Sequence, residues 1–248
     1  MSHSSRRSFL RTTAIASIGA GLSASLPASS LGRNSRLDEL RIGLIGCGGR
    51  GTGAAAQALS TAGPVRLVAM ADVFADHLDG ALGSLMENKT LAERIDVPKE
   101  RRFSGFDAYR GVLQADVDVV VIATPPHFRP QHFSEAIAAG KHVFFEKPVA
   151  VDAPGVRKVI AAAEVAQQKQ LSVVSGLQRH HQYGYLESMK RIHGGELGKI
   201  QYARCAWNMG ALWHRGRDEK WSDMEWQMRN WLYFTWLSGD HIVEQHVH

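Results

Sequence analysis

A glycine-rich stretch directly after a short apolar run constrains this chain more than any other feature. Residues 41–51 read Arg-Ile-Gly-Leu-Ile-Gly-Cys-Gly-Gly-Arg-Gly, and Ile42–Ile45 has the composition of a buried strand. Gly46 permits a tight turn after this strand, and Gly51 permits the following helix to pack closely against a sheet. The pattern predicts a strand, a glycine turn and a helix, the opening unit of a parallel α/β fold.

The same spacing predicts a binding site for a dinucleotide. Gly48, with Gly49 and Arg50 beside it, would let the backbone approach a pyrophosphate at the N-terminus of the helix. Asp72 ends the next apolar run, Val65–Ala71, about 20 residues further on, where a carboxylate can accept hydrogen bonds from a ribose. No arginine follows Asp72 directly and a carboxylate repels a 2′-phosphate, so the sequence favours NAD over NADP. A glycine-rich turn that binds no ligand is the alternative.

Strand and helix signals alternate through the first half of the chain. The later predicted strands are Val65–Ala71, Val117–Ala123, His142–Glu146 and Leu171–Ser175, and the predicted helices are Arg50–Thr61, Ala75–Arg94, Phe106–Gln114, Phe133–Ala139, Ala153–Gln168 and Tyr183–His193. This alternation is typical of a doubly wound parallel sheet, whose ligands lie beyond the carboxyl ends of the strands. We expect this domain to span residues 38–150.

Basic residues at the N-terminus contribute to the net charge of +5. Arg6 and Arg7 precede a mildly apolar stretch, Thr12–Leu26, and the pattern resembles a twin-arginine export signal. We therefore expect residues 1–30 to direct the chain to the periplasm through the twin-arginine machinery; a disordered basic tail is the alternative. No basic stripe interleaved with aromatic residues is present in the sequence, which argues against nucleic acid as a partner.

Five motifs together resemble the glucose–fructose oxidoreductase / inositol dehydrogenase / MocA (Gfo/Idh/MocA) family. They are Gly46–Gly51, Ala123–His127, Ala139–Val143, Glu146–Pro148 and Gly195–Ile200. The resemblance implies an N-terminal Rossmann domain followed by an α/β domain with a mainly antiparallel sheet. It also implies hydride transfer between nicotinamide and a hydroxyl-bearing carbon of a sugar, polyol or derivative. Because the implied second domain is longer than the part present, we expect the chain to be C-terminally truncated.

The resemblance assigns the chemistry to Glu146-Lys147-Pro148. In that family the lysine lies beside the nicotinamide and the reacting carbon, so Lys147 is the first catalytic candidate. A lysine desolvated beside a cationic ring has a lowered pKa and can help move the proton of a substrate hydroxyl. Glu146 is expected to contact the nicotinamide ribose, and Pro148 to follow a cis peptide bond. A surface lysine after an edge strand is the alternative.

The resemblance also assigns coenzyme contacts at two further places. These contacts are Thr124, Pro125 and His127 after the Val117–Ala123 strand, and Arg179. Arg179 lies where members of the family often direct a polar side chain toward the coenzyme.

The C-terminal sequence Glu244-Gln-His-Val-His248 resembles the Asp-x-Gly-x-His element of the family, whose histidine is often the proton acceptor. His248 is therefore the second catalytic candidate, with Glu244 as its orienting group. Glu244 in place of aspartate and His246 in place of glycine indicate an altered pocket. Zinc could use His241 together with these side chains, but the spacing matches no metal motif and we expect no metal.

The chain changes character after residue 150, and we expect a second domain over residues 151–248. Ile200–Met209 alternates like a long strand, and all six tryptophans lie between Trp207 and Trp236. The aromatic rings suit stacking on a sugar or packing in a core or subunit contact, and Asp223–Leu237 suits a substrate lid or an oligomer contact.

Three functions remain open from the sequence. The first is an exported NAD-dependent dehydrogenase of sugars or polyols, expected to be a homo-oligomer when full length. The second is a glycoside hydrolase that oxidises a sugar hydroxyl transiently with bound NAD, eliminates the aglycone and reduces the ring again. The third is a dinucleotide-binding protein without catalysis.

Overall fold

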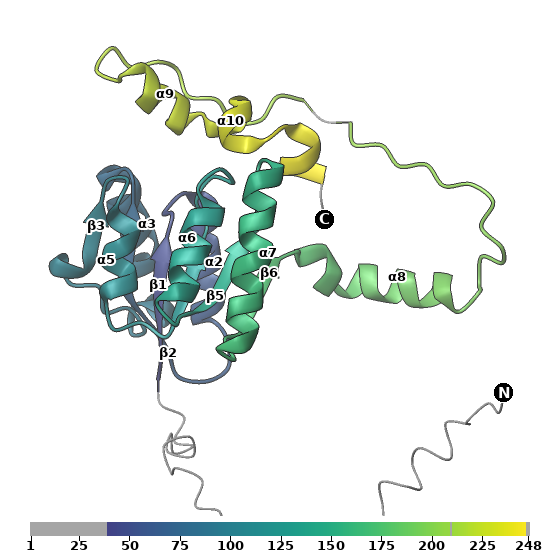
Figure 1. Cartoon of the computed structure of the whole chain (residues 1–248), viewed down its shortest axis with the longest axis horizontal. Helices are drawn as coiled ribbons and strands as arrows, with labels where there is room; N and C mark the ends of the chain where they lie inside the picture. The colour runs from purple at the N-terminus through teal and green to yellow at the C-terminus, as the bar shows by residue number, and fades with distance from the viewer. Residues whose placement is uncertain (1–38, 209, 247–248) are drawn as a thin grey trace, which may run out of the picture. The chain divides into compact units, whose positions relative to one another are not determined.

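The computed structural model describes residues 39–208 and 210–246 (Figure 1). Its strands form one parallel sheet in the order β3-β2-β1-β4-β5-β6. The strands are β1 (Leu40–Ile45), β2 (Val65–Asp72), β3 (Arg102–Ser104), β4 (Val119–Ile122), β5 (His142–Glu146) and β6 (Val173–Gly176). This is the strand order of a Rossmann fold, so the predicted doubly wound sheet is confirmed.

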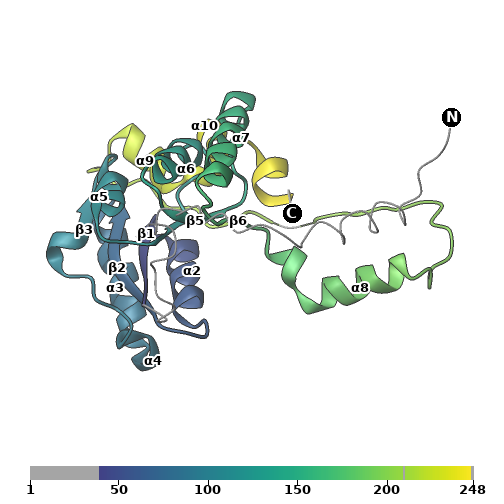
Figure 2. The ribbon, with the colours of Figure 1, turned by 60° about the horizontal axis from the view of Figure 1, so that its bottom comes forward.

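Helices cover both faces of the sheet, as Figure 2 shows. On one face, α2 (Gly49–Leu59), α3 (Ala75–Glu87) and α4 (Lys89–Ala92) bury their apolar side chains against β1 and β2. On the other, α5 (Ala108–Gln114), α6 (Arg129–Ala138) and α7 (Ala153–Gln168) pack around Phe133 and Phe145. This double cover explains the near-continuous apolar sequences of the central strands, because both faces of the sheet are buried at β1, β2 and β4.

The first turn of α6 is a helical segment that the sequence pattern missed, as are α9 (Asp223–Arg229) and α10 (Thr235–Ser238). The pattern predicted a helix from Phe133, whereas α6 begins at Arg129 with a proline in its first turn. A proline is compatible with that position because the first N–H groups of a helix have no intrahelical acceptor. Arg129 and His132 are buried despite being polar, which is why an apolar period did not reveal them.

The sheet continues past residue 150, where the sequence suggested a domain boundary. β6 pairs with β5 from Val143↔Val173 to Glu146↔Gly176, after the crossover helix α7. The elements that follow are η2 (Gln178–His181), α8 (Tyr183–His193), α9 (Asp223–Arg229), η3 (Trp231–Tyr233), α10 (Thr235–Ser238) and the π-helical η4 (Ile242–His246).

The strand predicted over Ile200–Met209 was wrong for the part that is described. Residues 200–208 are irregular, and no strand occurs after Gly176 in residues 177–208 or 210–246. An alternating pattern favours a strand only if a neighbouring strand accepts its hydrogen bonds, and here none does. The predicted antiparallel sheet is therefore not present in residues 177–208 or 210–246.

The predicted export signal, residues 1–30, lies outside the described residues, as does His248. Among the residues that are described, no helix has the length and apolar character needed to cross a membrane.

Candidate active site

The glycines of the first turn differ in what surrounds them. A Cβ on Gly46, whose φ is +95°, would lie 2.7 Å from the backbone of Thr124, and one on Gly51 would lie 1.8 Å from the carbonyl oxygen of Gly46. A Cβ on Gly48 or Gly49 would meet no atom within 4 Å. The outer glycines thus allow β1, β4 and α2 to pack closely, whereas the middle ones leave open space before the N-terminus of α2.

Asp72 links this turn to the end of β2. Its carboxylate accepts hydrogen bonds from the backbone N–H of Cys47 at 2.6 Å and of Phe74 at 2.9 Å. His77 Nδ1 lies 3.6 Å from the same carboxylate, and the Asp72 side chain is only 9% exposed. The carboxylate therefore fixes the glycine turn, and the predicted ribose contact stays a prediction.

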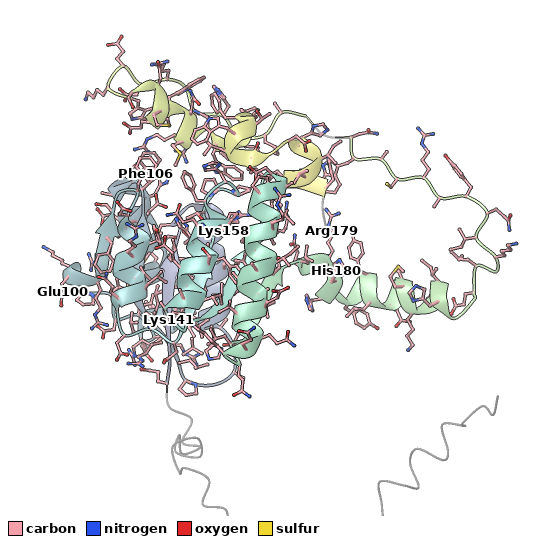
Figure 3. All side chains as sticks on the ribbon, in the orientation of Figure 1. Glu100, Phe106, Lys141, Lys158, Arg179 and His180 are labelled. Carbon is pink, nitrogen blue, oxygen red and sulfur yellow. The ribbon has the colours of Figure 1, made fainter. Side chains whose placement is uncertain are left out.

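A cavity opens at the carboxyl ends of β1, β2 and β4. Aromatic and apolar side chains dominate its wall, with Asp72 and the glycine turn at one side. The side chains that define it are Phe74, Phe106, Tyr109, Phe128, Met228 and Trp231; Phe106 is labelled in Figure 3. Thr124 and Pro125, two predicted contact residues, also line this cavity.

A neutral histidine forms part of the wall of this cavity. His132 Nδ1 is 3.2 Å from the hydroxyl of Thr124, and its ring centroid lies 4.2 Å from that of Tyr109. Burial lowers the pKa of His132 from 6.5 to about 4, and the carboxylate of Glu135 opposes this only in part. The ring is consequently uncharged near neutral pH. Sequence reasoning did not identify this residue.

The segment around α9 contributes Met228 and Trp231 to the wall of the same cavity, and Arg229 holds this segment in place. Arg229 makes a bidentate ion pair with Asp76, at 2.9 and 3.0 Å, and its Nε donates to Glu225 at 3.0 Å. Its guanidinium lies 3.9 Å from the ring centroid of Phe74 and 4.8 Å from that of Trp221. Met228 and Trp231 are thereby held against the cavity. No local pattern links Asp76 to Arg229, because 153 positions separate them in the sequence.

Lys147 and Glu244 meet at the end of β5. The Lys147 ammonium donates to the backbone carbonyl of Glu244 and lies 3.7 Å from its Oε1. The Lys147–Pro148 peptide is cis, as the resemblance implied. Burial lowers the pKa of Lys147, the charge of Arg129 lowers it further, and the carboxylates of Glu244 and Glu146 oppose both effects. Glu244 Oε2 is buried and has no hydrogen-bond partner in the described structure.

Glu146 is enclosed beside this pair. It is 4% exposed, and its Oε1 accepts a hydrogen bond of 2.7 Å from Arg50 Nε at the start of α2. A Cβ on Gly176 in β6 would lie 2.9 Å from Oε2, so a larger residue there would displace the Glu146 carboxylate. Glu146 and Arg50 therefore connect the glycine turn to the end of β5.

Arg129, which sequence reasoning missed, lies between the ends of β4 and β5. Its Nε donates to the carbonyl of Thr124 and its Nη1 to the carbonyl of Pro148, both at 2.7 Å. Only 3% of the residue is exposed. It thus joins the strand ends that carry the predicted contacts.

Glu244 also lines a second cavity. Its wall includes Trp207, Leu212, Tyr233, His241, Glu244 and His246. Arg179, labelled in Figure 3, stacks 4.8 Å from the ring centroid of Trp207 and does not line the first cavity. His127 is exposed, and its ring lies 5.3 Å from that of Trp236. No group of three or more potential metal ligands occurs within residues 39–208 and 210–246.

Comparison with known proteins identifies related chains. The family model "GFO_IDH_MocA: Oxidoreductase family, NAD-binding Rossmann fold" matches residues 40–175. An inositol 2-dehydrogenase of Klebsiella pneumoniae (strain 342) is 28% identical over 168 residues, covering 68% of this chain and 45% of that protein. A glycosyl hydrolase family 109 protein of Shewanella baltica (strain OS185) is 27% identical over 235 residues, covering 85% of this chain and 48% of that protein.

A solved structure with bound ligands shares the fold. It is the scyllo-inositol dehydrogenase of Lactobacillus casei with bound NAD(H) and scyllo-inositol, which is 25% identical with a TM-score of 0.50 and covers 65% of this chain and 43% of that chain. This chain spans about half the length of the curated relatives it matches. The family model matches more than half of the chain, and the chain belongs to the Gfo/Idh/MocA family of oxidoreductases with an NAD-binding Rossmann fold.

Proposed function

We propose that the protein is an NAD-dependent oxidoreductase acting on a CH–OH group of a sugar, polyol or derivative. The observation that carries this proposal is the meeting of Lys147 with Glu244 at the carboxyl edge of the sheet. Beside them, Glu146 and Arg50 connect to a glycine turn with open space in front of it. A largely buried lysine with a lowered pKa next to a coenzyme cleft can accept the proton of a substrate hydroxyl.

The residues present fit a dinucleotide. The open space at Gly48 and Gly49 admits a pyrophosphate to the N-terminus of α2, where no side chain caps the helix. The first cavity suits the flat, apolar adenine ring, and Asp72 in its wall is the proposed acceptor of hydrogen bonds from the ribose. When bound, the nicotinamide ring of this coenzyme supplies the hydride acceptor or donor.

We propose NAD rather than NADP as this coenzyme. Arg229, the cation that the structure brings beside Phe74, is already paired with the carboxylates of Asp76 and Glu225. A 2′-phosphate there would face Asp72 and two further acids. Replacing Asp72 with alanine should weaken NAD binding more than NADP binding, as measured by titration calorimetry; equal losses would contradict the assignment of Asp72 to the ribose.

Lys147 carries the proton transfer in this proposal. Its neutral amine takes the proton of the substrate hydroxyl while the carbon–hydrogen bond breaks and the carbonyl forms. Its hydrogen bond to the backbone of Glu244 fixes the nitrogen. Glu244 Oε2, which has no partner among the described residues, would accept a hydrogen bond from a substrate hydroxyl. We retain His248 as a second proton acceptor on the resemblance alone.

The runner-up is an NAD-dependent glycoside hydrolase. The longest of the alignments given above, covering 85% of this chain, is to a glycosyl hydrolase family 109 protein. The same residues would serve it, because transient oxidation of a sugar also needs a base beside the reacting hydroxyl.

One experiment separates these functions. The purified protein is incubated with NAD and either free inositols and sugars or aryl glycosides, and NADH absorbance and aglycone release are followed together. Net NADH formation with free polyols supports the dehydrogenase. Aglycone release without net NADH supports the hydrolase, and neither signal despite saturable NAD binding supports a protein that binds the dinucleotide without catalysis.

We also propose export and self-association of the protein. Arg6 and Arg7 with the following apolar stretch support the twin-arginine route, so an Arg6→Lys/Arg7→Lys variant should accumulate in the cytoplasm on fractionation. Exposed Tyr183, Tyr185 and Leu186 on α8 support a homo-oligomer, which light scattering of the purified protein would detect as a multiple of the chain mass.

A further inference from the structure

Arg129 is a buried cation whose hydrogen bonds both go to carbonyl groups. Its Nε holds the carbonyl of Thr124, after β4, and its Nη1 holds that of Pro148, directly after Lys147. By contrast, the guanidinium groups of Arg50 and Arg229 are paired with carboxylates. Burying a charge without such a partner costs desolvation free energy. A neutral side chain of similar shape would avoid this cost.

The position of this charge relates it to Lys147. Burial lowers the pKa of Arg129 to about 10, and the carboxylates of Glu146 and Glu244 oppose this from a distance. The same two acids act on Lys147 and favour its ammonium form, whereas Arg129 disfavours that form. The groups that face Lys147 are therefore two acids, from β5 and η4, and one cation, from α6.

We propose that Arg129 is a positioning residue for Lys147. Its guanidinium fork fixes the backbone on either side of the reaction site, and its charge counterbalances Glu146 and Glu244 so that the ammonium group can give up its proton. Neutral side chains could form part of the fork, but only a cation performs both tasks. The catalytic part of this inference rests on the proposed oxidoreductase function.

Two substitutions separate the two tasks. Arg129→Met removes the charge and both hydrogen bonds, whereas Arg129→Lys keeps the charge but cannot hold two carbonyls in a planar fork. Arg94→Met is the matched control, because Arg94 also donates to backbone carbonyls, those of Leu59, Thr61 and Gly63, and has no contact with Lys147.

Two measurements are made on each variant. In coenzyme-free protein, lysines are reductively methylated with ¹³C-formaldehyde and the pKa of Lys147 is followed by NMR, with the resonance assigned by Lys147→Arg. In separate samples, kcat and KM are measured for the substrate found by the screen.

Arg129→Met should raise the pKa of Lys147 and lower kcat about a hundredfold, the effect expected for a misplaced catalytic group. Arg129→Lys should leave that pKa near the wild-type value while lowering kcat about tenfold, and Arg94→Met should change neither. An unchanged Lys147 pKa in folded Arg129→Met, or wild-type kcat in Arg129→Lys, would overturn the proposal. If Arg129→Met does not fold, Arg129→Lys alone decides. If the protein shows no turnover, the proposed function fails, but the NMR titration still tests the action of Arg129 on Lys147.

Discussion

The carboxyl edge of the sheet has two regions that differ in the pairing and protonation of their ionisable side chains. Beside β1 and β2, the cavity is aromatic, His132 is neutral, and Arg229 is fully paired with acids. At the end of β5, Arg129 and Glu244 are buried, Lys147 is largely buried, and their pairing within the described residues is incomplete. A region that only binds gains from neutrality, whereas a region that moves a proton needs charged groups whose protonation can change.

Loss of Lys147 should give the largest effect. Lys147→Met should lower turnover at least a hundredfold, the scale of general acid–base assistance, and leave NAD affinity nearly unchanged. The matched control is Lys141→Met. Lys141 lies just before β5, at the end of the strand opposite to Lys147 (Figure 3), and its ammonium donates to the carbonyl of Val117. Equal turnover of the Lys147 variant and the wild type in steady-state assays would remove Lys147 from the mechanism.

Acid should destabilise the cavity region through His132. Because its pKa is about 4 in the folded chain and 6.5 when unfolded, the unfolded chain binds more protons between these values. Stability is then complete above pH 6.5 and falls as the pH drops to 4, by about 3 kcal/mol.

This contribution can be isolated with a substitution. In urea titrations at pH 7 and pH 4, His132→Gln should lose about 3 kcal/mol less than the wild type, and the exposed His193→Gln should behave like the wild type. Equal losses in the wild type and His132→Gln would show that the ring is not held neutral.

The open space at Gly48 predicts a change in binding without a change in stability. Gly48→Ala should keep the wild-type melting temperature, because its Cβ meets no atom within 4 Å, but weaken NAD about tenfold by blocking the approach of the pyrophosphate. Gly53→Ala, also with free space but one turn into α2, should retain full affinity. Unchanged affinity of Gly48→Ala in calorimetry would place the pyrophosphate elsewhere.

The smallest effect is expected from the cover of the cavity. Arg229→Met should free α9 from α3 and weaken binding of AMP and NAD alike, by about fivefold, with no effect on nicotinamide mononucleotide. The exposed Met224→Ala on the same helix is the control. Unaltered AMP affinity would show that Met228 and Trp231 do not contribute to the adenosine site.

The sequence predicted the strands and helices of the parallel sheet well, and the contacts between residues far apart in the sequence poorly. β5 and the helices α7 and α8 have the predicted bounds because apolar periods and local glycine or proline signals define them. Arg129 and Arg229 were missed because a polar residue in an amphipathic pattern is read as surface, and their partners lie elsewhere in the chain. The strand predicted over Ile200–Met209 failed for the related reason that pairing depends on a neighbour.

A calorimetric titration of the purified protein with NAD and with NADP tests the central claim most directly. Saturable binding of one NAD per chain, tighter than NADP and weakened by Gly48→Ala, is the predicted result. No saturable heat with either coenzyme, in protein that melts cooperatively, would contradict the account.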